Sequence, residues 1–440
     1  MRKPLLALLP FLLSTSFAAD GKIQFNRDIR PILAENCFHC HGPDPAARKA
    51  SLRLDTEAGF FAPRMTKDGK EEPPTIIKGQ PDKSTLFQRI ITKDEDEIMP
   101  PPKEHKTLKS AEIALVRRWI EQGAPWQPHW SLVAPVKAPL PEVADAAWAK
   151  NPIDRFVRAK LDAAGLKPAA EAAAATLVRR VSLDLTGLPP SPELLAKYAP
   201  NPEGRLDDAT LSALADELLA TPAYGEHRAR YWLDAARYAD THGLHFDAYR
   251  AMWPYRDWLV KAFNRNQPFD QFTVEQLAGD LLPNPTDEQL IATGLQRCNI
   301  TTNEGGTIVE ENLANYAADR VQTMGWVYLG LTTNCAQCHD HKFDPITMKD
   351  YYSMAAFFRN TTQGGLDGNV KDGRGPVLYL PTDADKPRWK ELPAAIAAAT
   401  AKVAETRKEG AALFEKWIAT AKPADLDADI PTKGLVATWR

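Results

Sequence analysis

Four of the five cysteines fall in two copies of one short pattern, in which two cysteines are separated by two residues and followed at once by a histidine. Thiols at this spacing can add across the two vinyl groups of a haem, and the next imidazole can then bind the iron, so the pattern indicates covalent attachment of c-type haem. The sequence therefore predicts one haem c at the first copy and a second at the other, with each histidine as proximal iron ligand. The two sets are Cys37, Cys40 and His41, and Cys335, Cys338 and His339.

The second copy leaves other chemistry open. His341 follows closely, and four such ligands could form a Cys2His2 zinc site, although zinc fingers separate their pairs by more residues. In an exported protein the two cysteines could instead form a disulfide. Under the haem interpretation His341 is too near in the chain to reach the opposite face of the same iron, so it would contact a propionate or another group. The sequence offers several candidates for the distal ligand: His227, His242, His245, Met324 and Met348.

Two helices must position the first copy. Apolar residues recur at every fourth position from Phe25 to Cys37, which predicts a helix with one buried face and with Asn26 as its N-cap. A second helix is expected between Ser110, as its N-cap, and Gly123, where it should end. A cytochrome c core needs such a pair of helices packed together beside the haem.

The sixth ligand of this haem should lie between the two helices. Met99 precedes three consecutive prolines, which hold the loop extended, and a thioether opposite a histidine raises the haem potential. Met65, in a polar loop, is the rival ligand, and the alternative interpretation of Met99 is a core methionine. The sequence thus predicts His41 and Met99 as the two axial ligands of the iron.

At this point a resemblance becomes specific. Residues 22–125 resemble a class I cytochrome c, and more closely the planctomycete-type cytochrome c module, through residues 26–31, the first cysteine pattern, the Met99 loop and residues 117–123. The next part of the chain resembles the uncharacterised domain that follows such modules in exported proteins of Planctomycetes and related bacteria. Its matching runs are 151–156, 183–190, 275–280, 303–306, 319–321 and 335–345. Because such genes occur beside polysaccharide-degradation genes, the resemblance implies a loose link to carbohydrate use.

The predicted fold is mainly α, a class I cytochrome c-like domain followed by a larger helical domain, because helical patterns separated by proline and glycine dominate the chain. The tail is expected to contain a loop, a long helix or helical hairpin over 385–421, and short strands at 378–380 and 434–440, and the chain reads as a truncated one. The predicted segments are a signal peptide over 1–18, the haem domain over 22–125, a linker over 126–141, the helical domain over 142–360 and the tail over 361–440.

Two stretches of the helical domain are more polar than packing requires. Residues 237–247 contain two histidines and two aspartates, and residues 303–311 contain Glu304, Glu310 and Glu311. One interpretation is a pocket lined by carboxylates near a haem. The alternative is turn chemistry, in which Asn and Gly adopt positive φ and acidic residues favour a helix N-terminus.

The N-terminus predicts export. Arg2 and Lys3 precede an apolar run over 5–13, and residues 16–18 form a cleavage site after Ala18. We therefore expect a periplasmic or cell-surface protein with no transmembrane span after cleavage. A net charge of −3 gives no indication of a nucleic-acid partner. Cys298, the remaining cysteine, is expected to be a buried, inert thiol.

Three functions remain open. The leading hypothesis is an exported c-type cytochrome that exchanges electrons with a redox partner protein or with a small-molecule donor or acceptor. The first alternative is a haem-dependent oxidoreductase acting on peroxide or a carbohydrate-related substrate, with the second haem or the adjacent polar pocket as its reacting centre. The second alternative is a carbohydrate-linked structural or binding protein with one haem.

Overall fold

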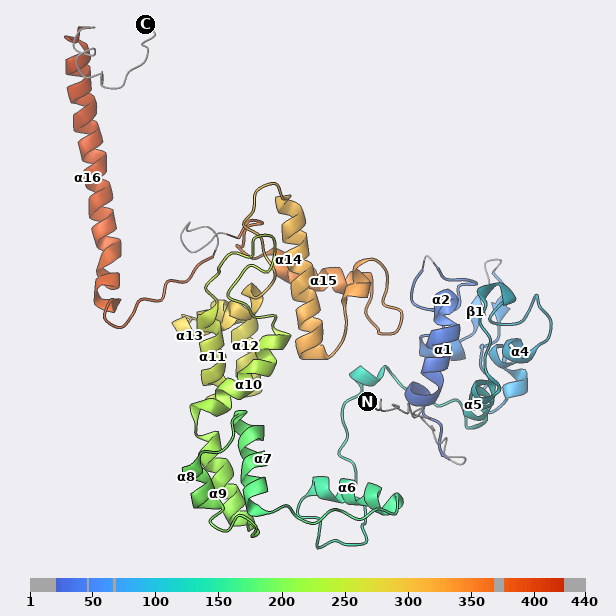
Figure 1. The fold of residues 1–440 in the computed structure, drawn as a ribbon. Coiled ribbons are helices and arrows are strands. Elements are labelled where there is room, and N and C mark those ends of the chain that lie inside the picture. The colour runs from blue at the N-terminus through green and yellow to red at the C-terminus, as the bar shows by residue number, and fades with distance from the viewer. Residues whose placement is uncertain (1–20, 46, 66–68, 368–375, 423–440) are drawn as a thin grey trace, which may run out of the picture. The chain divides into compact units, whose positions relative to one another are not determined.

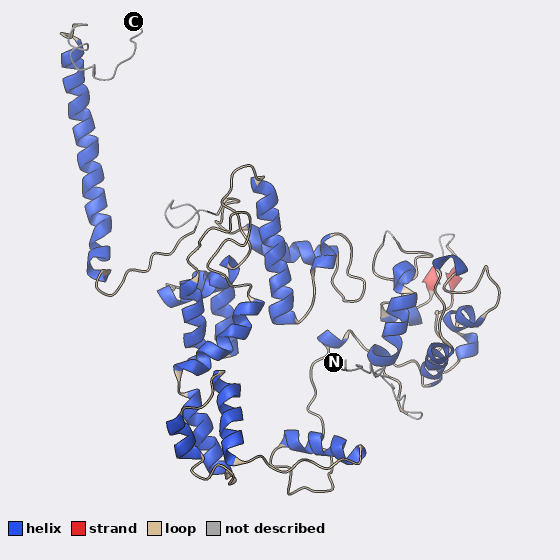
Figure 2. Cartoon of the chain, viewed as in Figure 1, coloured by secondary structure: helices blue, strands red, loops and turns tan. Residues whose placement is uncertain are grey.

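In a computed structural model the chain divides into two compact units, residues 1–376 and 377–440. The structure describes residues 21–45, 47–65, 69–367 and 376–422, so the predicted signal peptide and the predicted strand at 434–440 lie outside the described residues. The described elements are helices, apart from one short antiparallel pair between β1 (Arg64–Met65) and β2 (Glu71–Glu72) (Figures 1 and 2). The predicted mainly α fold is confirmed.

The first hydrophobic cluster, between Ile23 and Ala124, holds the elements around the first cysteine pattern. Phe25, Ile29 and Leu33 are all buried, as the four-residue spacing predicts, and the ring of Trp119 lies 5.5 Å from that of Phe25. The cluster falls within the predicted haem domain, whose exact boundaries remain predictions. Its helical elements are η1 (Phe25–Ile29), α1 (Arg30–Asn36), α2 (Phe38–His41), α3 (Glu57–Phe61), η2 (Pro81–Lys83), α4 (Thr85–Ile91), η3 (Pro102–Glu104) and α5 (Ser110–Glu121).

The predicted helix starts need two corrections. Asn26 is not an N-cap, because the helical segment starts after Gln24, and the Asn26 side chain instead donates to the Pro128 carbonyl at 2.6 Å. Ser110 is the first residue of α5 rather than its cap, and Lys109 occupies the cap position. The predicted end is confirmed, because α5 stops at Glu121 and Gly123 has a φ of +90°.

The following region is a series of short helices with smaller cores. One core includes Val178 and Leu214, a second Trp258 and Phe272, and a third Val321, Ala336 and Tyr351. The elements are η4 (Trp130–Leu132), α6 (Pro152–Ala163), α7 (Ala174–Thr186), α8 (Pro192–Tyr198), α9 (Asp208–Leu219), α10 (Pro222–Ala235), α11 (Trp253–Asn264), α12 (Phe269–Ala278), η5 (Gly279–Leu281), α13 (Asp287–Ala292), η6 (Thr293–Arg297), α14 (Val309–Met324), η7 (Gly325–Leu329), η8 (Asn334–Gln337) and α15 (Met348–Arg359).

Helices α10 and α11 approach closely at one glycine. A Cβ on Gly225 would lie 2.4 Å from the carbonyl oxygen of Val260, so only glycine fits there without a shift of the backbone. The backbone N–H of Gly225 also donates to the Asn264 side chain at 2.8 Å. This contact holds α10 and α11 side by side.

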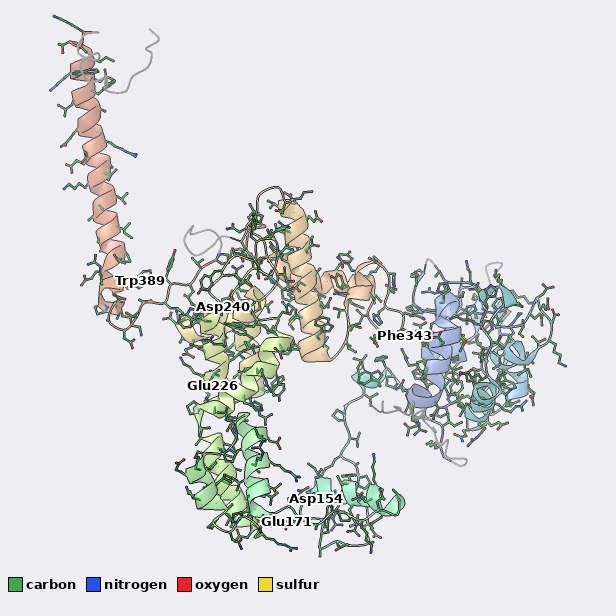
Figure 3. All side chains as sticks on the ribbon, in the orientation of Figure 1. Asp154, Glu171, Glu226, Asp240, Phe343 and Trp389 are labelled. Atoms are coloured by element: carbon green, nitrogen blue, oxygen red, sulfur yellow. The ribbon has the colours of Figure 1, made fainter. Side chains whose placement is uncertain are left out.

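The second unit is dominated by one helix, α16 (Lys386–Ile418), which starts near Trp389 in Figure 3. The predicted long helix or hairpin is therefore a single helix. The predicted short strand at 378–380 is wrong, because these residues form no strand. Among the described residues, no helix is both long and apolar enough to cross a bilayer.

Candidate functional site

A cavity of about 480 Å³ lies within the first domain, beside the first cysteine pattern. Cys37, His41 and Met99 all line this cavity, although Met99 is far from the other two in sequence. Much of the remaining lining is apolar, as a flat, largely hydrophobic ligand requires. The apolar lining includes Leu52, Leu54, Leu86 and Ile90.

Cys37 and His41 reach the cavity from one short turn. Cys37 ends α1, and the backbone N–H of His41 donates to the Cys37 carbonyl at 2.8 Å. Cys40, on the same turn, is half-buried and its N–H donates to the same carbonyl at 3.1 Å. The His41 carbonyl accepts from the backbone N–H of Leu54 at 2.7 Å, which fixes the turn against the cavity wall.

Burial tunes both side chains toward neutral forms. It raises the pKa of the Cys37 thiol to about 12, so the folded chain holds a thiol rather than a thiolate there. It also lowers the pKa of His41, which favours the neutral imidazole that binds iron. The Nδ1 atom of His41 is buried and has no hydrogen-bond partner among the described residues.

Met99 is held at the cavity by helix α4. Its backbone N–H donates to the Arg89 carbonyl at 2.9 Å, and the Arg89 guanidinium donates to the Glu97 carbonyl at 3.1 Å. The loop is therefore closed onto the helix whose Ile90 also lines the cavity. Met65, the rival candidate, is 59% exposed and does not line the cavity.

The donor set around the cavity fits a haem. A neutral imidazole and a thioether are the axial ligands of electron-transfer cytochromes, and a thiol stands beside the imidazole. Arg64 and Arg89 also line the cavity and could pair with the carboxylates of the propionates. Bound at this position, a haem would supply one-electron chemistry, and the chain would supply its axial ligands, its attachment points and an apolar surrounding.

The second cysteine pattern has different surroundings. Cys335, Cys338 and His339 are all exposed, and only Ala336 between them is buried, in the core shared with Val321 and Tyr351. The Nδ1 atom of His339 lies 2.8 Å from the Asp340 carbonyl, and all five cysteines are free. The predicted ligands are therefore on the surface, and the disulfide alternative is not formed in this structure.

His341 serves a turn. Its side chain is buried, and its Nδ1 accepts the backbone N–H groups of Phe343 at 3.2 Å and of Asp344 at 2.9 Å. The described residues contain no group of three or more histidine, cysteine or acidic side chains arranged to hold a metal ion. The four residues of the zinc alternative are thus not gathered into a ligand set in this structure.

Among the candidate distal ligands, Met348 is hydrogen-bonded through its backbone to the residue that directly follows the second pattern. Its backbone N–H donates to the Asp340 side chain at 2.8 Å, and the hydroxyl of Tyr352, on the same helix, donates to the Gln337 carbonyl at 2.9 Å. His242 and His245 lie elsewhere, against Thr301 and Thr302. His227 lies beside Gly187, and Met324 ends α14.

The loop after the second pattern contacts the first domain. The Arg30 guanidinium donates to the Phe343 carbonyl at 2.9 Å, and His129 Nε2 lies 3.1 Å from Asp344 Oδ1 (Phe343 is labelled in Figure 3). Asp344 is the same residue whose N–H binds His341. The hydrogen bond of Arg30 thus connects the loop that follows the second pattern to α1, the helix that directly precedes Cys37.

The first polar stretch lies against residues that flank the second. The N–H of Thr301 donates to the His242 carbonyl at 3.0 Å, and Arg237 pairs with Asp319 at 2.8 Å. In the second stretch Gly306 has a φ of +86°, and Glu310 and Glu311 are exposed in the first turn of α14, as the turn interpretation expects. His242 belongs to a largely buried cluster that also contains Arg250, Arg297 and Asp367, and the carboxylate-lined pocket stays a prediction.

Sequence reasoning missed these three residues. Arg250 and Arg297 stand outside any recognisable motif, and Asp367 follows the helical domain in a segment expected to be a loop. Their proximity depends on contacts across up to 117 positions of sequence. The arginine content of this region is the one sequence signal for such a cluster, but arginines on exposed helical faces give the same signal.

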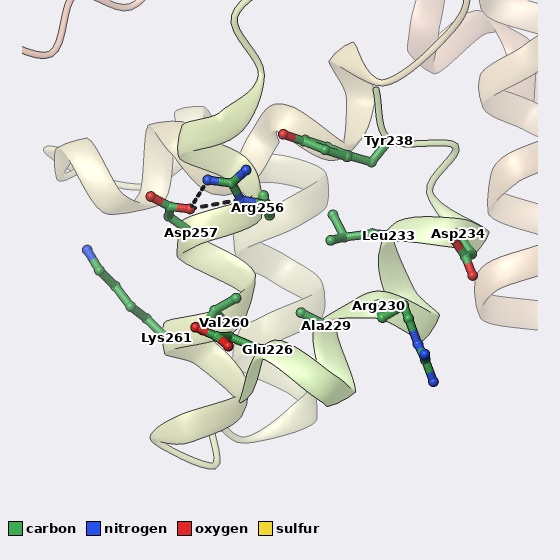
Figure 4. Close-up of a pocket in the computed structure, with 10 residues that line it drawn as sticks. All are labelled: Glu226, Ala229, Arg230, Leu233, Asp234, Tyr238, Arg256, Asp257, Val260 and Lys261. Atoms are coloured by element: carbon green, nitrogen blue, oxygen red, sulfur yellow. Dashed lines mark hydrogen bonds and ion pairs between the residues drawn. The ribbon is translucent and has the colours of Figure 1, made fainter. Parts of the chain in front are cut away.

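A larger surface hollow, of about 710 Å³, lies on α10 and α11 (Figure 4). Its floor is apolar, from Ala229, Leu233 and Val260, and its rim carries charges of both signs. Arg256 and Asp257 pair there at 2.8 Å. The hollow contains none of the predicted site residues, and its mixed charges favour no one ligand.

Comparison with protein families agrees with this arrangement. Residues 37–103 match the family described as planctomycete cytochrome C, and residues 152–363 match a protein family of unknown function, DUF1549. The chain therefore belongs to the proteins in which a planctomycete cytochrome c module precedes a DUF1549 domain. It is a c-type cytochrome through its first module. No curated protein and no solved structure is significantly similar to the chain.

Proposed function

We propose that this protein is an exported cytochrome that carries haem c in its first domain and passes electrons through it. The observation that carries the proposal is the cavity onto which Cys37, His41 and Met99 converge. An iron bound by imidazole and thioether is six-coordinate and cycles between two oxidation states with little change of ligands. Such a site suits electron exchange with a redox partner protein or a small-molecule donor or acceptor.

The second cysteine pattern carries a second haem in this proposal, with His339 as its proximal ligand. Cys335 and Cys338 are exposed and free, so both thiols are accessible for attachment. The contact of Arg30 with the Phe343 carbonyl supports a route for electrons between this pattern and the first haem. Met348, whose backbone is bound to Asp340, is the proposed distal ligand.

The test is a redox titration of the full-length protein, produced with the haem-attachment machinery. The proposal predicts reversible one-electron reduction of a low-spin haem, and rapid reoxidation by a soluble one-electron acceptor. Cyanide should not bind the oxidised first haem readily, because Met99 fills its sixth position. A first haem that is high-spin and binds cyanide at once would contradict the electron-transfer role and would favour catalysis at that iron.

A further inference from the structure

A largely buried cluster of arginines lies in the DUF1549 region: Arg250 and Arg320 are buried, and the side chain of Arg297 is 20% exposed. Arg250 Nη1 donates to Thr301 Oγ1 at 2.9 Å and pairs with Asp367 Oδ2 at 3.3 Å. Arg297 Nη2 pairs with the other oxygen of Asp367 at 2.7 Å. One carboxylate is thus shared by two guanidinium groups, and its side chain is fully buried.

A third arginine in this cluster has neutral hydrogen-bond partners. Arg320 Nε donates to the Gln296 carbonyl at 2.8 Å, and its Nη2 donates to the side-chain oxygens of Asn299 and Gln363. Burial, and then the positive charge of Arg297, lower its pKa to about 10. Arg320 still carries its charge at neutral pH, but it is buried and the hydrogen bonds that it donates are accepted by uncharged oxygens.

The charges do not balance. Arg250, Arg297 and Arg320 face one carboxylate, Asp367, and the adjacent pair of Arg237 and Asp319 adds one charge of each sign. A further carboxylate, Asp240, accepts from the Tyr238 hydroxyl at 2.5 Å and from the Met252 N–H at 2.8 Å. Even when Asp240 is counted, four arginines outnumber three carboxylates inside the cluster; Asp247, which also acts on His242, is an exposed side chain at its edge.

The same cluster contains buried nitrogens that have no hydrogen-bond partner. Among the described residues there are six of them: Arg237 Nε and Nη1, Arg250 Nε, Arg297 Nη1, His242 Nε2 and Gln363 Nε2. Buried polar groups are nearly always satisfied, and a buried charge without a counter-ion is costly. Water could satisfy the hydrogen bonds but could not neutralise the excess charge, whereas an anion does both.

Thr301 connects His242 to this cluster. The Thr301 hydroxyl oxygen accepts from Arg250 and lies 2.8 Å from His242 Nδ1, and the hydroxyl also bonds to Asp367. When the hydroxyl proton points to Asp367, Thr301 accepts from the Nδ1–H of neutral His242, and Nε2 carries no proton. His242 is therefore not counted among the donors to an anion.

We propose that this cluster binds a small oxyanionic group, a carboxylate, phosphate or sulfate, through Arg250, Arg297 and Gln363. The flat guanidinium groups suit such oxygens, because each can donate two parallel hydrogen bonds. The site is distinct from the haem cavity, and the inference does not depend on electron transfer. It assigns a binding function to the DUF1549 region of this chain.

The experiment uses the full-length holoprotein. Thermal unfolding of the helical region is followed by circular dichroism in phosphate, sulfate or acetate, each compared with chloride at equal ionic strength. A saturable rise in Tm is expected with at least one of the three anions, roughly 5 to 10 °C at about a hundredfold excess over Kd. The anion that raises the Tm shows whether the bound group is a phosphate, a sulfate or a carboxylate. Calorimetric titration with that anion gives the affinity directly.

Two variants and a control sharpen the test. Arg297→Gln should weaken anion binding at least tenfold. Arg297→Lys keeps the charge and can still pair with Asp367, so its anion affinity should lie between that of Arg297→Gln and that of the wild type. Arg230→Gln removes an exposed arginine of the surface hollow and should bind like the wild type. Equal Tm in all four salts, or an anion effect unchanged in Arg297→Gln, would overturn the proposal. The wild-type measurement decides even if the Gln variant fails to fold.

Discussion

The backbone N–H of Met99 donates to the carbonyl oxygen of Arg89, 2.9 Å away, so the methionine is fixed to the helix that lines the cavity beside Cys37 and His41. A loop methionine that was free to swing would make a poor axial ligand. Here the loop is closed by a second contact, from the Arg89 guanidinium to the Glu97 carbonyl. These two hydrogen bonds of Arg89 therefore hold Met99 beside the cavity, where its thioether is proposed to bind the iron.

Replacing Met99 with alanine should lower the midpoint potential of the first haem. The thioether stabilises the reduced iron, and axial ligands account for a span of about 0.8 V, so we expect a fall on the order of 0.1 V. The spectrum should also become high-spin. Spectroelectrochemistry measures both. Met65→Ala is the matched control, because Met65 is 59% exposed. The midpoint potential of the first haem in this variant should equal that of the wild type. A Met65 effect without a Met99 effect would reverse the assignment.

Trp119 should be a main contributor to the stability of the first domain. Its ring is fully buried, lies 5.5 Å from Phe25 and 5.7 Å from Phe60, and its Nε1 donates to the Pro125 carbonyl at 3.1 Å. Trp119→Ala should lower the free energy of unfolding by about 3 to 5 kcal/mol. Denaturant unfolding followed through the haem absorbance measures this loss.

The control for Trp119 is Trp130, which is 59% exposed. Trp130→Ala should change the free energy of unfolding by no more than about 0.5 kcal/mol, as is usual for surface positions. If the two variants lost equal stability, the hydrophobic cluster between Ile23 and Ala124 would not be the core of that domain.

Asp367→Asn should destabilise the helical region in a pH-dependent way. Burial raises the pKa of Asp367, but the ion pairs with Arg297 and Arg250 outweigh burial and hold that pKa below its ordinary value. A carboxyl with a depressed pKa stabilises the fold above its unfolded pKa, near 3.9, and this contribution is lost as the pH falls through the folded value. At pH 7 the variant should lose about 3 to 5 kcal/mol.

The measurement is urea unfolding of both proteins between pH 3 and 7. The difference between Asp367→Asn and the wild type should be largest at neutral pH. It should shrink below about pH 4, where the unfolded wild-type chain takes up a proton that the folded carboxyl still resists. Asp257→Asn is the control, because its pair with Arg256 is half exposed and should contribute no more than about 1 kcal/mol. A difference that stayed constant with pH would show that the charge of Asp367 is not what stabilises the fold.

The local features of the haem site could be predicted from sequence because their signals are local. The spacing of Cys37, Cys40 and His41 is a chemical requirement, the prolines after Met99 restrict its loop, and the buried face of Phe25, Ile29 and Leu33 follows from helical periodicity. The cavity that joins Met99 to His41 agrees with that reasoning. The haem-binding roles themselves remain predictions until a haem is measured.

Features that depend on distant contacts could not be predicted. Asn26 has a suitable side chain for an N-cap, but that side chain instead donates a hydrogen bond to the distant Pro128 carbonyl. His341 has the composition of a metal ligand, yet a tight turn takes its Nδ1 atom. The arginine cluster needs Arg250 and Asp367 to meet across 117 positions, and no periodicity in the sequence indicates such a meeting.

The most direct test of the central claim is the number of covalent haems on the mature protein, made in a host with the haem-attachment machinery. Intact mass and a pyridine haemochrome spectrum together give this number. We predict two haems, with one lost in a Cys37→Ala, Cys40→Ala variant and the other lost in a Cys335→Ala, Cys338→Ala variant. A wild-type protein with one haem, retained when Cys335 and Cys338 are replaced, would remove the second site from the account. A wild-type protein without covalent haem would contradict the account as a whole.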